Sequence, residues 1–170
     1  MPKTSIVFAA ALAFVMSASI AHAQATKVVE KFKDWVLYSH SGAPAKICFI
    51  SAQPREKKPA EYDKDPSYFY ISAWPDDGVK AEISVKIGKE LQNGSDVSIQ
   101  IGGSRYKLFA KGDKAFVGDA TEELKLIEAM KRGSFMVVRA TVSDGTALEE
   151  TYSLLGVTAA VNSLRRGCAS

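Results

Sequence analysis

The chain has 170 residues and a formal net charge of +3, and 46% of its residues are hydrophobic. This length suits a short targeting segment followed by one ordinary domain, which buries enough surface to fold without a metal ion or a dense set of disulfides. The charge excess is small and basic residues alternate with acids, so the composition argues against a nucleic-acid partner.

The first 23 residues have the three parts of a secretory signal peptide. Lys3 gives a positive start, residues 6–16 form an apolar run, and the Ala-His-Ala of residues 21–23 marks a cleavage site before Gln24. The apolar run is shorter than the roughly 20 residues that cross a bilayer, and no second long apolar segment follows. We therefore predict an exported protein, periplasmic or secreted, with no membrane span after cleavage and a single mature domain over residues 24–170.

Short alternating or apolar runs, separated by turn residues, predict that the mature chain is mostly β-strand. In chain order, strands are expected over residues 35–38, 46–51, 68–74, 80–87, 97–101, 106–110, 115–117 and 135–142, with a last strand ending near residue 153. Residues 54–66 are rich in proline and charge, and we expect them to form a long exposed loop.

Two helices are predicted late in the chain. Asp119 and Glu122 have the spacing of a capping box, and Gly133 follows the segment as a C′ residue. The apolar face of this first helix is formed by Leu124, Ile127 and Met130. The apolar face of the C-terminal helix is formed by Val157, Ala160, Val161 and Leu164. Because the regular βαβ alternation of a parallel sheet is missing, we predict an antiparallel β-sandwich, immunoglobulin-like, with two accessory helices.

The sequence holds two cysteines, Cys48 and Cys168. In an exported protein an isolated pair is most simply a disulfide bond. Two free buried thiols or an intermolecular bridge are the alternatives. Two cysteines and one mature histidine, His40, do not make a zinc site, and we predict no metal and no cofactor.

Aromatic residues alternate along the predicted strand 68–74. Tyr68, Tyr70 and Trp74 share one side, with Ser72 between them. The other side carries Phe69, Ile71 and Ala73. We favour the interpretation that the larger aromatics fill the space between two sheets. In the alternative interpretation they face outward as binding residues for sugars or a protein partner.

No catalytic set emerges from the sequence. His40 falls in a predicted polar turn without a nucleophile motif. The acidic pairs at 76–77, 122–123 and 149–150 have structural explanations in a turn, a helix start and a strand whose neighbours point in opposite directions. A carbohydrate-acting enzyme remains an alternative that requires two carboxylates across one cleft. A periplasmic hydrolase inhibitor presenting residues 54–66 is another.

Several segments resemble proteins of the invasion-associated locus B family. The opening is similar at residues 32–35 (Phe-Lys-Asp-Trp), 46–48 (Lys-Ile-Cys) and Gln53. Further similar segments, typical of one branch of the family, are residues 68–75, 82–88, 115–117, 121–124 and 151–160. The resemblance implies an exported, bacterial, single-domain β-sandwich protein whose family is associated with host-cell invasion.

The resemblance also bears on the cysteines and on function. Many members have a cysteine shortly after the tryptophan, where this chain has Tyr38 and Ser39, and this difference favours the long Cys48–Cys168 link. We therefore expect a non-catalytic envelope or secreted protein that binds another macromolecule, with an unidentified protein or cell-envelope partner and a role in host interaction. The sequence does not indicate an oligomeric state.

Overall fold

The computed structural model describes residues 26–41 and 46–167. The predicted signal peptide, its cleavage site and Cys168 lie outside these residues. The strands are β1 (Thr26–Phe32), β2 (Trp35–His40), β3 (Ile47–Ala52), β4 (Glu56–Lys58), β5 (Tyr68–Trp74), β6 (Val79–Lys86), β7 (Val97–Ile101), β8 (Ser104–Lys111), β9 (Lys114–Phe116), β10 (Phe135–Thr141) and β11 (Ala147–Ser153). The helices are α1 (Ala120–Arg132), α2 (Val157–Gly167) and the 3-10 helices η1 (Ala60–Lys64) and η2 (Pro75–Asp77).

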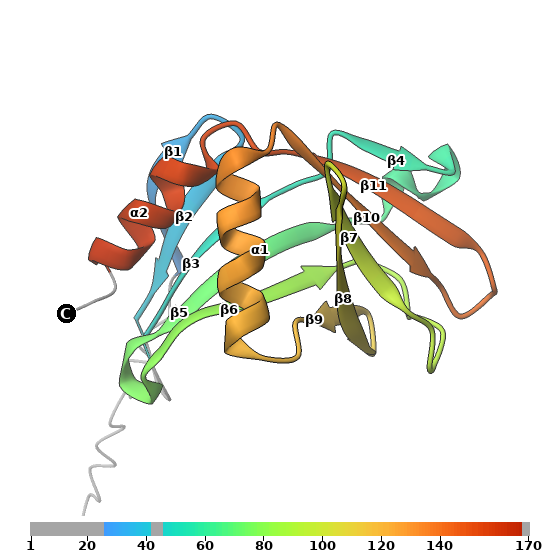
Figure 1. Cartoon of the computed structure of the whole chain (residues 1–170), viewed down its shortest axis with the longest axis horizontal. Coiled ribbons are helices and arrows are strands. Elements are labelled where there is room, and N and C mark those ends of the chain that lie inside the picture. Colours follow the sequence, from blue (N-terminus) through green and yellow to red (C-terminus); the bar gives the residue numbers. More distant parts are fainter. Residues whose placement is uncertain (1–25, 42–45, 168–170) are drawn as a thin grey trace, which may run out of the picture.

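All strand pairs are antiparallel and join into one open sheet in the order β1-β2-β3-β5-β6-β9-β8-β7-β10-β11-β4. The sheet folds over at β8, which pairs with β7 through its first five residues and with β9 through its last three. As a result β7, β10 and β11 cross in front of β3, β5 and β6 (Figure 1). The prediction of an antiparallel β-sandwich with two helices is confirmed, and its two layers are continuous through β8.

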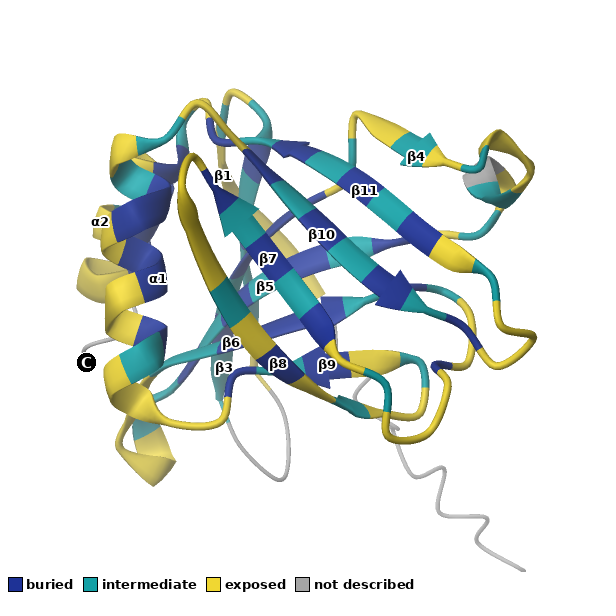
Figure 2. Cartoon of the chain, turned by 45° about the vertical axis from the view of Figure 1, so that its right-hand side comes forward, coloured by how far each residue is buried: buried dark blue, intermediate teal, exposed yellow. Residues whose placement is uncertain are grey.

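The core lies between the two layers and under the helices. Inward residues alternate with partly exposed ones along β5, β10 and β11 (Figure 2). Phe69 of β5 is fully buried and contacts Tyr152 of β11 with ring centroids 5.9 Å apart, so this pair joins the layers. Trp35 packs edge-on against Phe69 at 5.8 Å, and its indole Nε1 donates to the Ser153 carbonyl at 3.1 Å. A buried indole N–H usually has such an acceptor.

Both helices begin and pack largely as the sequence predicts. The Asp119 carboxylate caps α1 by accepting from the backbone N–H groups of Thr121 and Glu122 at 2.9 and 3.0 Å. Leu124, however, is exposed, and α1 buries Glu123, Leu126, Ile127, Ala129 and Met130. All four predicted apolar residues of α2 are buried.

Gly133 ends α1 for a different reason from the one predicted. Its backbone is extended, with φ −86°, and is not the left-handed conformation of a C′ glycine. A Cβ at this position would lie 2.7 Å from Ile101 Cγ2 and 2.9 Å from Leu154 Cδ1. Glycine is therefore required by the close approach of the core and not by the turn.

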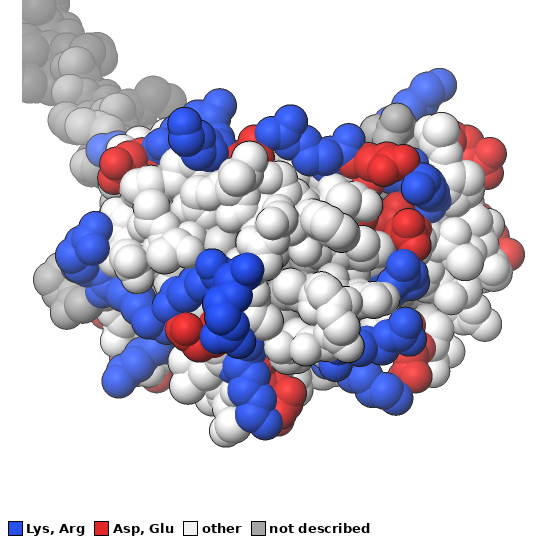
Figure 3. Space-filling model, turned by 45° about the horizontal axis from the view of Figure 1, so that its top comes forward, with Lys and Arg blue, Asp and Glu red and all other residues white. Residues whose placement is uncertain are grey.

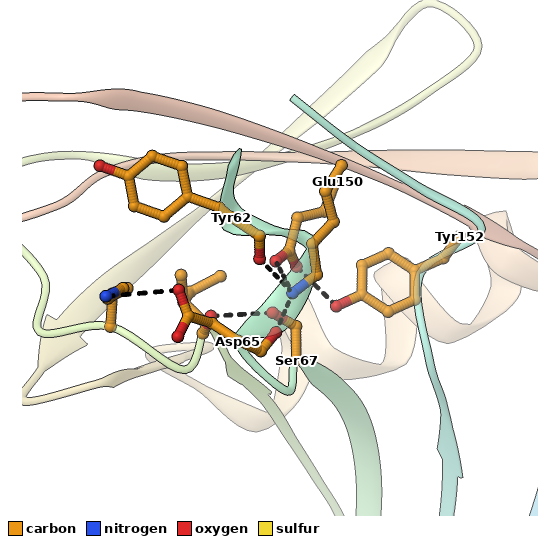
Figure 4. A network of polar contacts seen from close by, with 8 residues as sticks. Tyr62, Asp65, Ser67, Glu150 and Tyr152 are labelled. Atoms are coloured by element: carbon orange, nitrogen blue, oxygen red, sulfur yellow. Dashed lines mark hydrogen bonds and ion pairs between the residues drawn. The ribbon is translucent and has the colours of Figure 1, made fainter. Parts of the chain in front are cut away.

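The segment 54–66 is largely exposed, as predicted, but the prediction that it forms a loop is wrong. Within this segment β4 pairs with β11, and η1 follows it. The Lys57 ammonium lies 3.9 Å from Glu150 Oε1, donates to the Tyr62 carbonyl at 3.3 Å, and donates to the Asp65 carbonyl (Figure 4).

Glu150 connects this segment to the core. Its Oε2 accepts from the Tyr152 hydroxyl at 2.7 Å, and burial raises the pKa values of both side chains. A charged segment can thus pack against the domain when its lysine pairs with a buried carboxylate and donates hydrogen bonds to backbone carbonyls. The pattern of charges in the sequence does not reveal these partners.

Candidate binding surface

The orientation of β5 determines which aromatic residues are available for binding. Phe69 and Ile71 are fully buried and Ala73 is nearly so, whereas Tyr68, Tyr70 and Trp74 lie on the partly exposed outer side. The favoured interpretation, that the larger aromatics fill the space between the sheets, is therefore wrong. The inner space is already occupied by aliphatic residues in one register row across four strands, namely Leu37, Ile50, Ile71 and Ile83.

The outer side carries a connected set of rings from three strands. Tyr38 of β2 is the register partner of Phe49 of β3, and the two rings stack at 5.0 Å with an interplanar angle of 14°. Phe49 meets Tyr70 edge-on at 5.9 Å, and Tyr70 stacks on Tyr68 at 5.9 Å. We call Tyr38, Phe49, Tyr68 and Tyr70 the aromatic face.

Tyr38 and Phe49 were not predicted from the sequence as members of this face. Both alternate with buried residues along their strands, Tyr38 after Leu37 and Phe49 after Cys48. Once the buried side of β5 is known, this alternation indicates that Tyr38 and Phe49 face outward. Trp74 lies beyond a β-bulge at the end of β5, and among the described residues its buried Nε1 has no hydrogen-bond partner.

Serines flank Tyr70 on both neighbouring strands. Ser51 of β3 and Ser84 of β6 are its register partners, and both are buried. The surface around Tyr70 is therefore formed by the neighbouring aromatic rings and not by these serines. Burial, followed by the nearby Tyr68 and Tyr38 hydroxyls, raises the pKa of Tyr70. The Tyr70 hydroxyl is therefore neutral at physiological pH.

Charged residues border the aromatic face at opposite ends. Lys86 is opposite Tyr68, and Lys114 is opposite Lys86 on the next strand. Lys86 Nζ lies 3.7 Å from Asp113 Oδ2, and Glu82 lies farther along β6 on the same side. Charges of both signs also surround a broad uncharged area in the view of Figure 3.

The acidic pairs do not form paired catalytic carboxylates. Glu149 Oε2 accepts from Arg139 Nε at 2.9 Å on the outer side, whereas Glu150 points inward to Tyr152. Glu122 accepts from Lys125 Nζ at 2.7 Å, whereas Glu123 is buried. Asp76 and Asp77 are exposed in η2.

His40 also differs from its predicted setting. It lies in β2 and not in a turn, with its Nδ1 3.2 Å from Thr26 Oγ1. Among the described residues no group of three or more metal-ligating side chains gathers, and no helix there is long and apolar enough to cross a membrane.

The sequence matches the family described as Invasion associated locus B (IalB) protein over residues 35–165. The chain belongs to the IalB family. The fold is similar to the crystal structure of invasion associated protein B from Bartonella henselae, with a TM-score of 0.61 and 15% identity over 86% of this chain and 99% of that chain. A search of curated protein sequences finds no match.

The IalB match confirms the family resemblance of the sequence and covers the aromatic face completely. It begins at Trp35, the first residue of β2, and ends at Arg165 within α2. β1 lies before the matched region. The three strands that carry the aromatic face, together with the core behind them, are thus part of the IalB domain itself.

Proposed function

We propose that this IalB-family chain is an exported, non-catalytic bacterial protein that binds a cell-envelope or host protein through its aromatic face. The observation that carries the proposal is the connected set of rings on the outer side of β2, β3 and β5. Four neighbouring rings directed away from the core serve no packing between the two layers. These rings are half-buried, and a contiguous partly exposed apolar surface of this kind is typical of interaction sites.

The chemistry of the face favours a protein partner. It lies on a sheet and not in a deep cleft, and it combines tyrosine and phenylalanine with small serines. Tyrosine and phenylalanine are enriched in protein interfaces because they bury a large area with few rotatable bonds. Ser51 and Ser84 are buried beside Tyr70, so the surface offered to a partner here is that of the aromatic rings.

Export is supported by the signal-peptide pattern of residues 1–23 and by IalB membership. We expect the mature protein to begin at Gln24. N-terminal sequencing of the protein recovered from the periplasm or medium tests this. Recovery of an uncleaved chain in the membrane fraction contradicts it.

A binding role is better supported than either alternative. The two acids of each neighbouring pair point to different surroundings. They therefore do not support the carbohydrate-acting enzyme, which requires two carboxylates across one cleft. The inhibitor hypothesis needed a protruding loop, and residues 54–66 instead contain β4 and the anchored Lys57.

Site-specific photo-crosslinking in intact cells tests the binding surface. A benzoylphenylalanine in place of Tyr38 is expected to give a discrete adduct, whereas the same group in place of exposed Phe135 on β10 is not. The double variant Tyr68→Ser/Tyr70→Ser is expected to reduce the Tyr38 adduct at least about tenfold, because central aromatic residues dominate interface energy.

The matched control is Phe135→Ser, which removes an exposed aromatic residue on β10. This variant is expected to keep the adduct. Equal adducts from positions 38 and 135, or an adduct insensitive to the loss of both tyrosines, contradict the proposal.

A further inference from the structure

A pocket of about 550 Å³ lies between the start of β6 and the start of α1. Its apolar walls come from four elements, and the principal lining residues are Val79, Ala81, Phe109, Phe116, Val117 and Leu124. A pocket of this size is in the range that holds a small ligand or a large side chain.

The pocket exists because β9 is short. The β6–β9 pairing ends at Ser84 and Phe116, and the chain then turns away into α1. Beyond that point the Ile83 carbonyl accepts from Val117 N–H at 3.3 Å, and the Ile83 N–H donates to Glu123 Oε1 at 3.0 Å. The first turn of α1 thus replaces a strand beside β6 and leaves the space above it unfilled.

Exposed apolar side chains gather at the rim of this pocket. Phe109 and Leu124 are 52% and 51% exposed, and Val79 is 37% exposed. They form three of the seven large hydrophobic side chains that are exposed among the described residues. Their convergence on one concave site is the arrangement expected where a partner inserts an apolar group.

The pocket is continuous with the aromatic face. Tyr70, Ser84, Phe116 and Phe109 are successive register partners across β5, β6, β9 and β8, and the two phenylalanine rings stack at 5.7 Å. One row of outward side chains therefore leads from the aromatic face to the pocket rim.

The polar residues that line the pocket determine whether a bound group should carry positive or negative charge. Glu82, Asp119 and Glu123 line the pocket with one basic residue, Lys80. Burial, and then the charges of Glu82 and Asp119, raise the pKa of Glu123, against the hydrogen bond from Ile83. A cation next to the apolar group would relieve this repulsion between carboxylates.

We propose that this β6–α1 pocket is the anchor site for the protein partner of the aromatic face, and that it receives an apolar side chain flanked by a basic residue. The inference rests on the proposed binding function. It adds the chemistry of the partner segment, which is apolar at its centre and positively charged at its sides.

A peptide series tests the pocket directly by nuclear magnetic resonance on the ¹⁵N-labelled mature protein. Acetyl-Lys-Phe-Lys-amide is expected to bind with a millimolar Kd and to shift the amide signals of Val79, Val117 and Leu124. Acetyl-Glu-Phe-Glu-amide and acetyl-Lys-Ser-Lys-amide are expected to bind at least about tenfold more weakly. Equal binding of all three peptides, or shifts confined to other regions, overturns the inference.

Variants separate the two chemical requirements. Leu124→Ser and Glu123→Gln are each expected to weaken acetyl-Lys-Phe-Lys-amide severalfold. Glu122→Gln is the matched control, because Glu122 lies in the same helical turn but engages Lys125. Unchanged spectra away from the pocket establish that each variant is folded. Equal weakening by Glu122→Gln overturns the charge requirement.

The same variants distinguish this inference from the proposed function. If the Tyr38 adduct persists when Phe109→Ser and Leu124→Ser are combined, the aromatic face binds without the pocket and the inference is wrong. If no Tyr38 adduct forms at all, the proposed function fails, whereas peptide binding still reports on the pocket.

Discussion

At the scale of single residues, two glycines with similar backbone angles have very different surroundings. Gly156 joins β11 to α2 with φ 93°, and a Cβ there would lie 2.0 Å from the Phe32 carbonyl oxygen. Gly145 lies in the β10–β11 turn with φ 88°, and a Cβ there would have no neighbour within 4 Å. Comparison of the two separates the cost of the backbone angle from the cost of a steric clash.

We predict that Gly156→Ala lowers the free energy of unfolding by about 2–5 kcal/mol, because the left-handed angle costs about 1–2 kcal/mol and overpacking adds about 1–3 kcal/mol. For Gly145→Ala we expect only the cost of the left-handed angle, about 1–2 kcal/mol. Urea denaturation of both variants measures the difference. Equal losses would show that the contact with Phe32 relaxes without cost.

At the scale of elements, the buried ion pair makes β4 and η1 part of the folded domain. We predict that Lys57→Met releases this segment, because it leaves Glu150 buried without its cation, a change that costs about 3–5 kcal/mol in comparable sites. Tryptic cleavage after Lys64 is expected to accelerate at least about tenfold. Adding Glu150→Gln restores protection, because the amide still accepts from Tyr152 without a buried charge.

The control for this prediction is Lys58→Met. Lys58 is adjacent in β4, but its side chain is exposed and pairs only with surface acids. Its loss is expected to leave the cleavage rate unchanged, because exposed ion pairs contribute little to stability. If Lys58→Met accelerates cleavage as much as Lys57→Met does, the effect comes from weakened pairing of β4 with β11 and not from the buried ion pair.

The elements that the sequence predicts are those with one buried and one wet side, such as residues 80–87. β1 was missed because six of its seven residues are exposed at the sheet edge, so no alternation marks it. For β5 the alternation separates Tyr68 and Tyr70 from Phe69 correctly, but the inward side depends on space left by other strands. The sequence therefore predicts which residues of β5 share a side, but not which of the two sides faces outward.

At the scale of the whole molecule, consecutive pairing of β2, β3 and β5 assembles the aromatic face from residues far apart in sequence. The β6–α1 pocket has the same origin, since it arises where a three-residue strand ends and a helix takes its place. The sequence predicts a short strand over residues 115–117 and a helix after it, but it does not predict that both lie beside β6. Local signals thus predict the layers, whereas surfaces built between elements follow from their arrangement.

The last prediction concerns the covalent closure of the domain. Cys48 is buried on β3, α2 packs against β2 and β3, and Cys168 directly follows the last residue of α2. We therefore predict an intramolecular Cys48–Cys168 bond that joins the third strand to the end of the chain. The chain-entropy model assigns about 4–5 kcal/mol to so long a loop.

Mass analysis of the exported protein is expected to show a monomer two hydrogens lighter than the reduced chain, with neither cysteine alkylated until a reductant is added. Cys168→Ser is expected to lower the free energy of unfolding by about 2–5 kcal/mol, the usual loss when a small exported domain loses a disulfide. Two alkylatable thiols in the untreated protein would contradict the bond, and a disulfide-linked dimer would contradict its intramolecular form. Because α2 also packs against α1, loss of the bond is expected to loosen the C-terminal helix before the sheet, so protection from hydrogen exchange should fall first at Val161 and Leu164.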